Sequence, residues 1–119
     1  MIARLKQALE GSQQRRVVAA AMRRVRVFYD TGFNLESRRQ FCSRFVREVL
    51  LEATGVSIGN VETFETLLRR NPRHPLRYWR CWYLGRIPWK RRTVTPASLL
   101  ASPYVHILWD NRCKTVEGE

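Results

Sequence analysis

The stretch of sequence that decides the fold is Phe41-Cys42-Ser43-Arg44-Phe45-Val46. It opens a run in which apolar side chains recur at the spacing of one helix face, at Phe41, Cys42, Phe45, Val46, Val49, Leu50 and Ala53. Gly55 follows this run, and glycine often ends a helix in the left-handed conformation. We therefore expect a helix from about residue 39 to residue 54, with one buried face and with Cys42 close to its N-terminus.

Upstream of this helix, the sequence predicts a strand, a further helix and a loop. Residues 2–6 favour a short strand, and Ser12 suits the N-cap of a helix that continues to about Tyr29. Apolar residues recur through that segment at helical spacing, at Val18, Ala21, Met22, Val25 and Phe28. Turn-forming residues then occupy positions 30–34, where Gly32 is free to take a positive φ.

Two helices are expected downstream, over residues 62–70 and residues 75–84, with a Pro-containing breaker between them. The second carries four aromatic side chains that we expect to lie in the core or an interface, namely Tyr78, Trp79, Trp82 and Tyr83. Gly85 would end it.

Near the carboxyl end, Thr95 and Pro96 suit the start of a short helix over residues 97–100. The composition of residues 104–109 favours a strand. The sequence therefore predicts a single α+β domain over residues 1–110, followed by a polar tail over residues 111–119.

The composition supports one compact domain, since the chain has 119 residues and 45% hydrophobic content. Its longest uncharged stretch, from Thr93 to Trp109, contains two prolines and cannot form a spanning helix of roughly 20 apolar residues. The amino terminus lacks the continuous apolar core of a secretory signal, so we expect a cytoplasmic protein. Three widely spaced cysteines, at positions 42, 81 and 113, do not suggest a zinc site, and we expect no metal or cofactor.

Cys42 has a position that suits a nucleophile. A thiol near a helix N-terminus lies at the positive end of the helix dipole, which favours the thiolate. The unpaired N–H groups there, especially that of Cys42, could also stabilise the oxyanion that forms when a thiolate attacks a carbonyl. The alternative is a structural role, because free cysteine is often a small buried hydrophobe within a helix stripe.

A family resemblance favours the nucleophile. Tyr29-Asp30-Thr31-Gly32-Phe33, followed by the stretch around Cys42, resembles the cysteine motif of the YiiX/YebB-like branch of the NlpC-type, circularly permuted papain-like hydrolases. Three later segments resemble the YebB-like subgroup in particular: Glu62-Thr63-Phe64, Gly85-Arg86-Ile87-Pro88-Trp89 and Thr93-Val94-Thr95-Pro96-Ala97-Ser98-Leu99. The likeness covers nearly the whole chain.

The resemblance implies a permuted papain-like fold in which a cysteine at a helix N-terminus acts with a histidine on a sheet strand. In the permuted order that histidine precedes the cysteine, and this sequence has only His74 and His106, both after Cys42. We therefore expect a chain that keeps the Cys-bearing helical part with one or two strands and lacks the N-terminal strands of the sheet. Neither histidine is assigned a catalytic role.

By this resemblance Cys42 is the nucleophile, and Tyr29, Asp30 and Ser43 are candidates for the substrate pocket. Tyr29 could instead support the cysteine loop or merely complete the apolar face of its helix. The expected function is that of a cysteine hydrolase of amidase, peptidase or acyl-transfer type, which forms an acyl-thioester on Cys42. A peptide, an amide or an acyl lipid could be its substrate, and without the histidine the chain alone is expected to be inactive.

The main alternative is a basic nucleic-acid-binding module. The net charge is +12, and arginines alternate with aromatic residues from Tyr78 to Trp89. Against it, the basic residues spread over every segment and form no recognised motif, so we expect no specific nucleic-acid partner. A membrane surface is a third, less favoured partner. An exposed sheet edge could also associate with another polypeptide.

Overall fold

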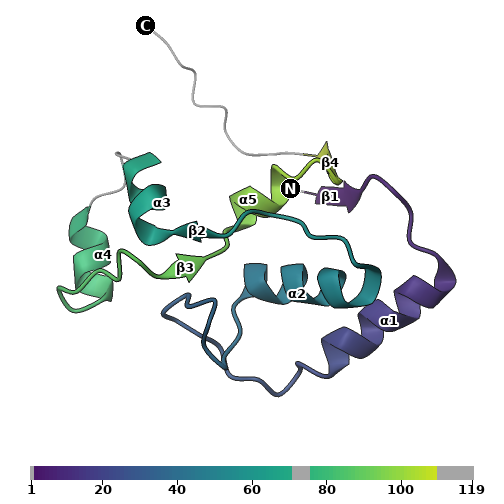
Figure 1. Cartoon of the computed structure of the whole chain (residues 1–119), viewed down its shortest axis with the longest axis horizontal. Coiled ribbons are helices and arrows are strands. Elements are labelled where there is room, and N and C mark those ends of the chain that lie inside the picture. Colours follow the sequence, from purple (N-terminus) through teal and green to yellow (C-terminus); the bar gives the residue numbers. More distant parts are fainter. Residues whose placement is uncertain (1, 71–75, 110–119) are drawn as a thin grey trace, which may run out of the picture.

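The computed structural model describes residues 2–70 and 76–109, so His74 and the expected tail over residues 111–119 lie outside the described residues. In chain order the elements are β1 (Ile2–Leu5), α1 (Gly11–Met22), α2 (Cys42–Thr54), β2 (Glu62–Thr63), α3 (Phe64–Arg70), α4 (Leu76–Trp82), β3 (Arg92–Thr93), α5 (Pro96–Leu100) and β4 (Val105–Trp109). Helix α2 lies in the middle, with α1 packed against it, and α3 and α4 are at the opposite end of the molecule from α1 (Figure 1). The expected α+β class is confirmed.

Helix α2 begins three residues later than the sequence suggested. Gln40 is held in extended backbone before the helix, because its N–H donates to the Phe28 carbonyl and its carbonyl accepts from the Asp30 N–H. Phe41 is the N-cap, with an extended φ of −133°, and Cys42 is the first helical residue. At the other end Gly55 takes the left-handed conformation, with φ at 76°, as predicted.

Helix α1 differs at both ends from the expected one. It starts after Glu10, whose N–H donates to Gln13 Oε1 at 3.0 Å, and the expected cap Ser12 lies inside the helix. It ends at Met22, and the chain continues through turns before Tyr29 forms a parallel bridge with Gln40. The helical pattern beyond Met22 thus gives way to pairing with a segment that lies distant in sequence.

The strands form two separate antiparallel pairs. β1 pairs with β4 at the two ends of the described chain, where strands were expected at residues 2–6 and 104–109, and the pairing itself was not predicted. β2 pairs with β3, with Glu62 opposite Thr93 and Thr63 opposite Arg92. This second pair was not predicted, and it shortens the expected helix over residues 62–70, which begins only at Phe64.

The α4 region is more exposed than its aromatic content suggested. The Tyr78 and Trp82 side chains are about half exposed, so these two do not lie in the core, and the expected alternative of an interface stays a prediction for them. Trp79 is the exception on this helix, because its ring packs edge-on against the buried Phe64. None of the helices among the described residues is long and apolar enough to cross a membrane.

Candidate functional site

Cys42 occupies the first position of α2, and its side chain is exposed. The N-terminal N–H groups of a helix have no partner within it, and those of Cys42, Ser43 and Arg44 make no hydrogen bond within the described part of the chain. The Phe41 side chain offers no capping group, and the first turn contains no acidic residue. When the Cys42 sulfur attacks a carbonyl, the oxyanion that forms on the carbonyl oxygen would therefore lie near free backbone donors. No carboxylate of this turn would lie near it.

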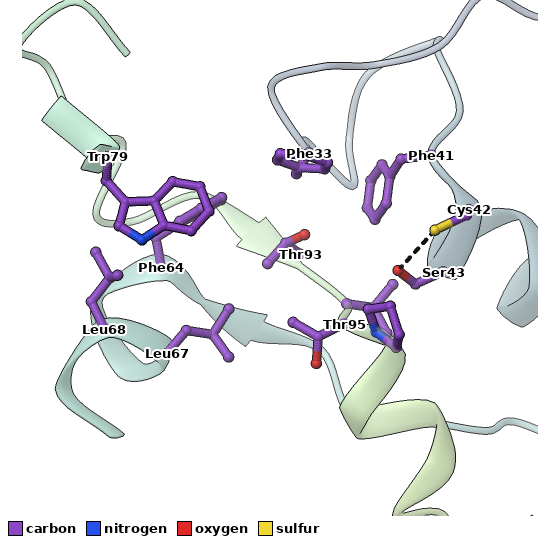
Figure 2. A pocket seen from close by; sticks show the side chains of 12 residues that line it. Phe33, Phe41, Cys42, Ser43, Phe64, Leu67, Leu68, Trp79, Thr93 and Thr95 are labelled. Carbon is purple, nitrogen blue, oxygen red and sulfur yellow. Dashed lines mark hydrogen bonds between the residues drawn. The ribbon is translucent and has the colours of Figure 1, made fainter. Parts of the chain in front are cut away.

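A pocket of about 290 Å³ opens beside Cys42. Its wall is formed by the N-terminus of α2, the loop before it, α3, α4 and the segment from β3 into α5. The lining residues are Phe33, Phe41, Cys42, Ser43, Phe64, Leu67, Leu68, Trp79, Thr93, Val94, Thr95 and Pro96. Cys42 and Ser43 lie at one end, and Trp79 and Leu68 at the other (Figure 2). No charged side chain is among these lining residues, so the pocket favours an uncharged, largely apolar group.

Ser43 lines the same pocket next to Cys42. Its side chain is buried, and its hydroxyl oxygen lies 4.0 Å from the Cys42 sulfur, at the limit of a weak hydrogen bond in which either atom could donate. Burial of a hydroxyl beside the thiol gives the reacting end of the pocket a polar wall. A binding role for Ser43 stays a prediction.

Asp30 belongs to the loop that precedes α2 and is not among the pocket-lining residues. One carboxylate oxygen accepts from the Gly32 N–H at 2.8 Å, and the other accepts from the Asn34 N–H at 3.2 Å and from Ser37 Oγ at 2.5 Å. Burial raises the pKa of Asp30, but the hydrogen bonds from Ser37, Gly32 and Asn34 together outweigh it and hold the pKa below its ordinary value. Asp30 is thus placed to order the loop.

Tyr29 is also outside the pocket lining, and its side chain is about half exposed beside the bridge to Gln40. Its position is compatible with support of the cysteine loop through the backbone. Whether Tyr29 or Asp30 contacts substrate stays a prediction.

The loop after Asp30 places Phe33 in the pocket. Phe33, and not the expected Gly32, takes the positive φ, at 54°. At Gly32 space is limited instead, because a Cβ there would lie 2.9 Å from Arg91 Nη1 and the Arg91 side chain would have to move. That guanidinium donates to the Gly32 carbonyl at 3.0 Å, and Tyr83 Oη donates to the same oxygen at 2.9 Å. The region after α4 therefore fixes the conformation that turns Phe33 toward Phe41 (Figure 2).

Arg44, in the first turn of α2, fastens the other side of this loop. Its guanidinium donates to the Ser37 carbonyl at 2.6 Å and to the Arg39 carbonyl at 2.8 Å, and it pairs with Glu48 at 2.7 Å. Burial raises the pKa of Glu48, but the hydrogen bonds from Gln40 and Arg44 lower it by a larger amount. The pKa of Glu48 is therefore below its ordinary value, and the carboxylate form is favoured. The backbone just before Cys42 is held by charge-assisted bonds on both sides.

The sequence-based interpretation missed most of the pocket wall. Leu67, Leu68 and Trp79 carry no motif, and each could equally belong to a core. Two sequence signals were available, because Phe64 and the segment over residues 93–96 were already part of the family resemblance. Their side chains turn out to line the pocket with Cys42.

His74 lies outside the described residues, so only His106 can be placed relative to this site. His106 lies in β4, opposite Arg4 of β1, with an exposed side chain, and it is not a pocket-lining residue. Over residues 2–70 and 76–109 no group of three or more His, Cys, Asp or Glu side chains could hold a metal ion. The residues that the structure describes therefore place an exposed thiol beside unpaired backbone N–H groups, without a described histidine side chain beside them.

Two comparisons relate this chain to known proteins. Residues 1–109 match the model of a family described as permuted papain-like amidase enzymes of the YaeF/YiiX type. A crystal structure described as that of the metalloprotein YiiX from Escherichia coli O157:H7 is similar, with a TM-score of 0.78 and 26% sequence identity. The match covers 87% of this chain and 57% of that one, so the chain spans little more than half the length of this relative. No curated protein matches the chain significantly.

These likenesses confirm the permuted papain-like fold that the cysteine motif implied. The description of YiiX as a metalloprotein concerns that protein. The His, Cys, Asp and Glu side chains of the described residues do not form a metal site of three or more ligands. The narrower YebB-like assignment stays a prediction.

Proposed function

The chain belongs to the YaeF/YiiX family of permuted papain-like amidase enzymes, and from that premise we propose that Cys42 is the nucleophile of a cysteine amidase. One observation carries the proposal: Cys42 is the first residue of α2, exposed, and opens on the 290 Å³ pocket. The family match supports an enzyme over the nucleic-acid-binding alternative.

The proposed reaction has two halves. The Cys42 thiolate attacks an amide carbonyl, a bond forms between sulfur and the carbonyl carbon, and the oxyanion is stabilised by the N–H of Cys42. The carbon–nitrogen bond then breaks, and the amine leaves after it takes up a proton. Water attacks the resulting acyl-thioester, releases the acid and restores the thiol.

Proton transfer in both halves needs an acid and a base, and the described residues that line the pocket include no group suited to this task. We infer that the base comes from outside the described residues and that His106 does not supply it. Turnover by the described residues alone should then be slow, because they lack general acid–base catalysis worth about 10²–10⁴-fold.

Selective alkylation tests the assignment of the nucleophile. Cys42 and Cys81 are both free and exposed, but Cys81 lies in the last turn of the seven-residue helix α4 and not at a helix N-terminus. In a Cys113→Ser background, the rate of iodoacetamide modification is measured at each thiol by mass spectrometry. We expect Cys42 to react at least about tenfold faster, since it is exposed at a helix N-terminus beside unpaired N–H groups.

Urea-unfolded protein is the control, in which the two rates should become similar. Equal rates at Cys42 and Cys81 in the folded protein would remove the support for Cys42 as an activated nucleophile. A faster reaction at Cys81 would argue directly against it.

A further inference from the structure

Leu84 follows α4 in a backbone conformation that leucine rarely adopts. Its φ is 53°, in the left-handed region where glycine usually ends a helix. The Leu84 N–H donates to the Cys81 carbonyl at 3.3 Å, and the Gly85 N–H donates to the Arg80 carbonyl at 2.6 Å, which completes a Schellman motif. The Leu84 side chain is 92% exposed, so almost no packing within the described residues offsets this strain. Contacts within the described chain therefore do not explain a leucine at this position.

Tyr78 and Trp82 add to the apolar surface around Leu84. They lie one helical turn apart, stack on each other with ring centroids 6.3 Å apart, and are each about half exposed. Trp82 Nε1 donates to the Thr31 carbonyl at 2.9 Å, so the exposed part of this ring is mainly hydrocarbon. We call Tyr78, Trp82 and Leu84 together the α4 apolar surface. It lies at the end of the molecule opposite α1 (Figure 1).

Unpaired arginines flank the α4 apolar surface. An open surface hollow of about 750 Å³ is lined by Arg77, Arg80, Cys81, Leu84 and Gly85. Arg86 is exposed in the turn that follows. None of these three arginines forms an ion pair with a carboxylate among the described residues. The sequence from Thr66 to Trp109 contains no acidic residue at all, so this surface is uniformly basic.

We propose that the α4 apolar surface and its arginines bind the surface of an anionic phospholipid bilayer. Leu84 enters the apolar layer, the Tyr78 and Trp82 rings lie at its boundary, and the guanidinium groups bind lipid phosphates. Aromatic rings favour this boundary, and the affinity of an interfacial contact grows with its buried apolar area and with its attraction to anionic lipids. The inference goes beyond the proposed function and does not depend on Cys42.

Two other partners fit these residues less well. Single-stranded nucleic acid binds by stacking bases on aromatic rings, but the Trp82 ring already stacks on Tyr78 and, with centroids 6.5 Å apart, on Phe33. A phosphate backbone would also leave Leu84 exposed. A second copy of the chain, related by a two-fold axis, would bring the same arginines against one another.

Sedimentation with lipid vesicles tests the proposal. The partition coefficient of the full chain is measured for vesicles of phosphatidylcholine alone and for vesicles of phosphatidylcholine and phosphatidylglycerol in equal parts. We expect binding to the anionic vesicles to be at least about tenfold stronger, because each arginine near an anionic surface contributes about fivefold. Added salt should weaken it. No binding to anionic vesicles at low salt, or equal binding to both kinds, would overturn the proposal.

Leu84→Asn separates membrane binding from folding. Asparagine adopts the left-handed conformation more readily than leucine, so the thermal unfolding temperature should not fall. The partition coefficient should fall at least about tenfold, because an apolar side chain is lost from the bilayer. Val18→Asn is the matched control, since Val18 is 61% exposed on α1, at the opposite end of the molecule. It should change the partition coefficient by less than about twofold.

A pair of double variants tests whether the arginines act locally. Arg77→Gln with Arg80→Gln should lower the partition coefficient at least about tenfold. Arg15→Gln with Arg16→Gln removes the same charge from α1, where both side chains are exposed, and should lower it no more than about threefold. Equal losses in the two double variants would show that only net charge matters and would overturn the assignment of this surface.

The remaining outcomes distinguish the partner and the proposed function. Single-stranded DNA that binds the chain, is weakened by Arg77→Gln but not by Leu84→Asn, and is accompanied by no vesicle binding would assign the surface to nucleic acid and overturn the proposal. Cys42→Ala should bind vesicles as the wild type does. Failure of Cys42 as a nucleophile would therefore leave the vesicle result intact, and failure of vesicle binding would leave the nucleophile assignment intact.

Discussion

Phe33 packs edge-on against Phe41, with ring centroids 5.9 Å apart and ring planes at 86°. Phe41 is the N-cap of α2, so this contact joins the loop after Asp30 to the residue that immediately precedes the nucleophile candidate. Both rings also line the pocket. The same contact thus shapes the pocket and fixes the backbone from which Cys42 projects.

Asp30→Asn should destabilise the chain and loosen this loop. The pKa of Asp30 lies below the ordinary value of 3.8, so the ionised form stabilises the fold at neutral pH and this contribution is lost as the pH falls through the folded-state pKa. At pH 7 we expect the free energy of unfolding in urea to fall by about 1–3 kcal/mol. As the pH falls below 3.8, the difference between wild type and variant should shrink.

Ser37→Ala serves as a partial version of that change, because it removes one of three donors to the carboxylate. It should cost less than Asp30→Asn. An Asp30→Asn penalty that is the same at both pH values would show that the charge of Asp30 contributes nothing to stability.

Gly59→Ala should be more disruptive than Gly85→Ala. Both glycines have a positive φ, of 78° and 84°, so each substitution carries a backbone strain of about 1–2 kcal/mol. A Cβ at Gly59 would in addition lie 2.7 Å from a methyl carbon of Leu99, whereas a Cβ at Gly85 meets no atom within 4 Å. Thermal unfolding should show the larger loss for Gly59→Ala, and equal losses would mean that the loop does not press on α5.

His106→Ala should leave the reactivity of Cys42 unchanged within about twofold, because His106 lies in β4 and outside the pocket that Cys42 opens on. The iodoacetamide rate at Cys42 and the residual amidase rate are the measurements. A loss of tenfold or more in either rate, with an unchanged unfolding curve, would identify His106 as the base.

Sequence signals predicted correctly the ends of helices that are determined by residues adjacent in the chain. Gly55 ends α2, and Thr95 caps α5 by accepting from the Ser98 N–H at 3.2 Å, as the sequence predicted. The end of α1 was wrong because the segment after Met22 pairs through Phe28 with Gln40, a contact that helical spacing does not encode.

The site was predictable only at its reactive end. Cys42 and Ser43 could be named because one motif carries both. The far end could not, because α3 and α4 meet there only through tertiary packing. The positive φ of Phe33 was hidden for a similar reason, since bonds from Tyr83 and Arg91 to the Gly32 carbonyl hold that loop.

Location of the acyl group by mass spectrometry tests the central claim most directly. The full chain with all its cysteines is incubated briefly with p-nitrophenyl octanoate, digested and treated with neutral hydroxylamine, which cleaves thioesters. We predict a hydroxylamine-sensitive octanoyl group on Cys42 in excess over Cys81, and its loss in Cys42→Ala. An octanoyl group spread equally over Cys42 and Cys81, or absent from Cys42 while present elsewhere, would contradict the claim that Cys42 is the nucleophile.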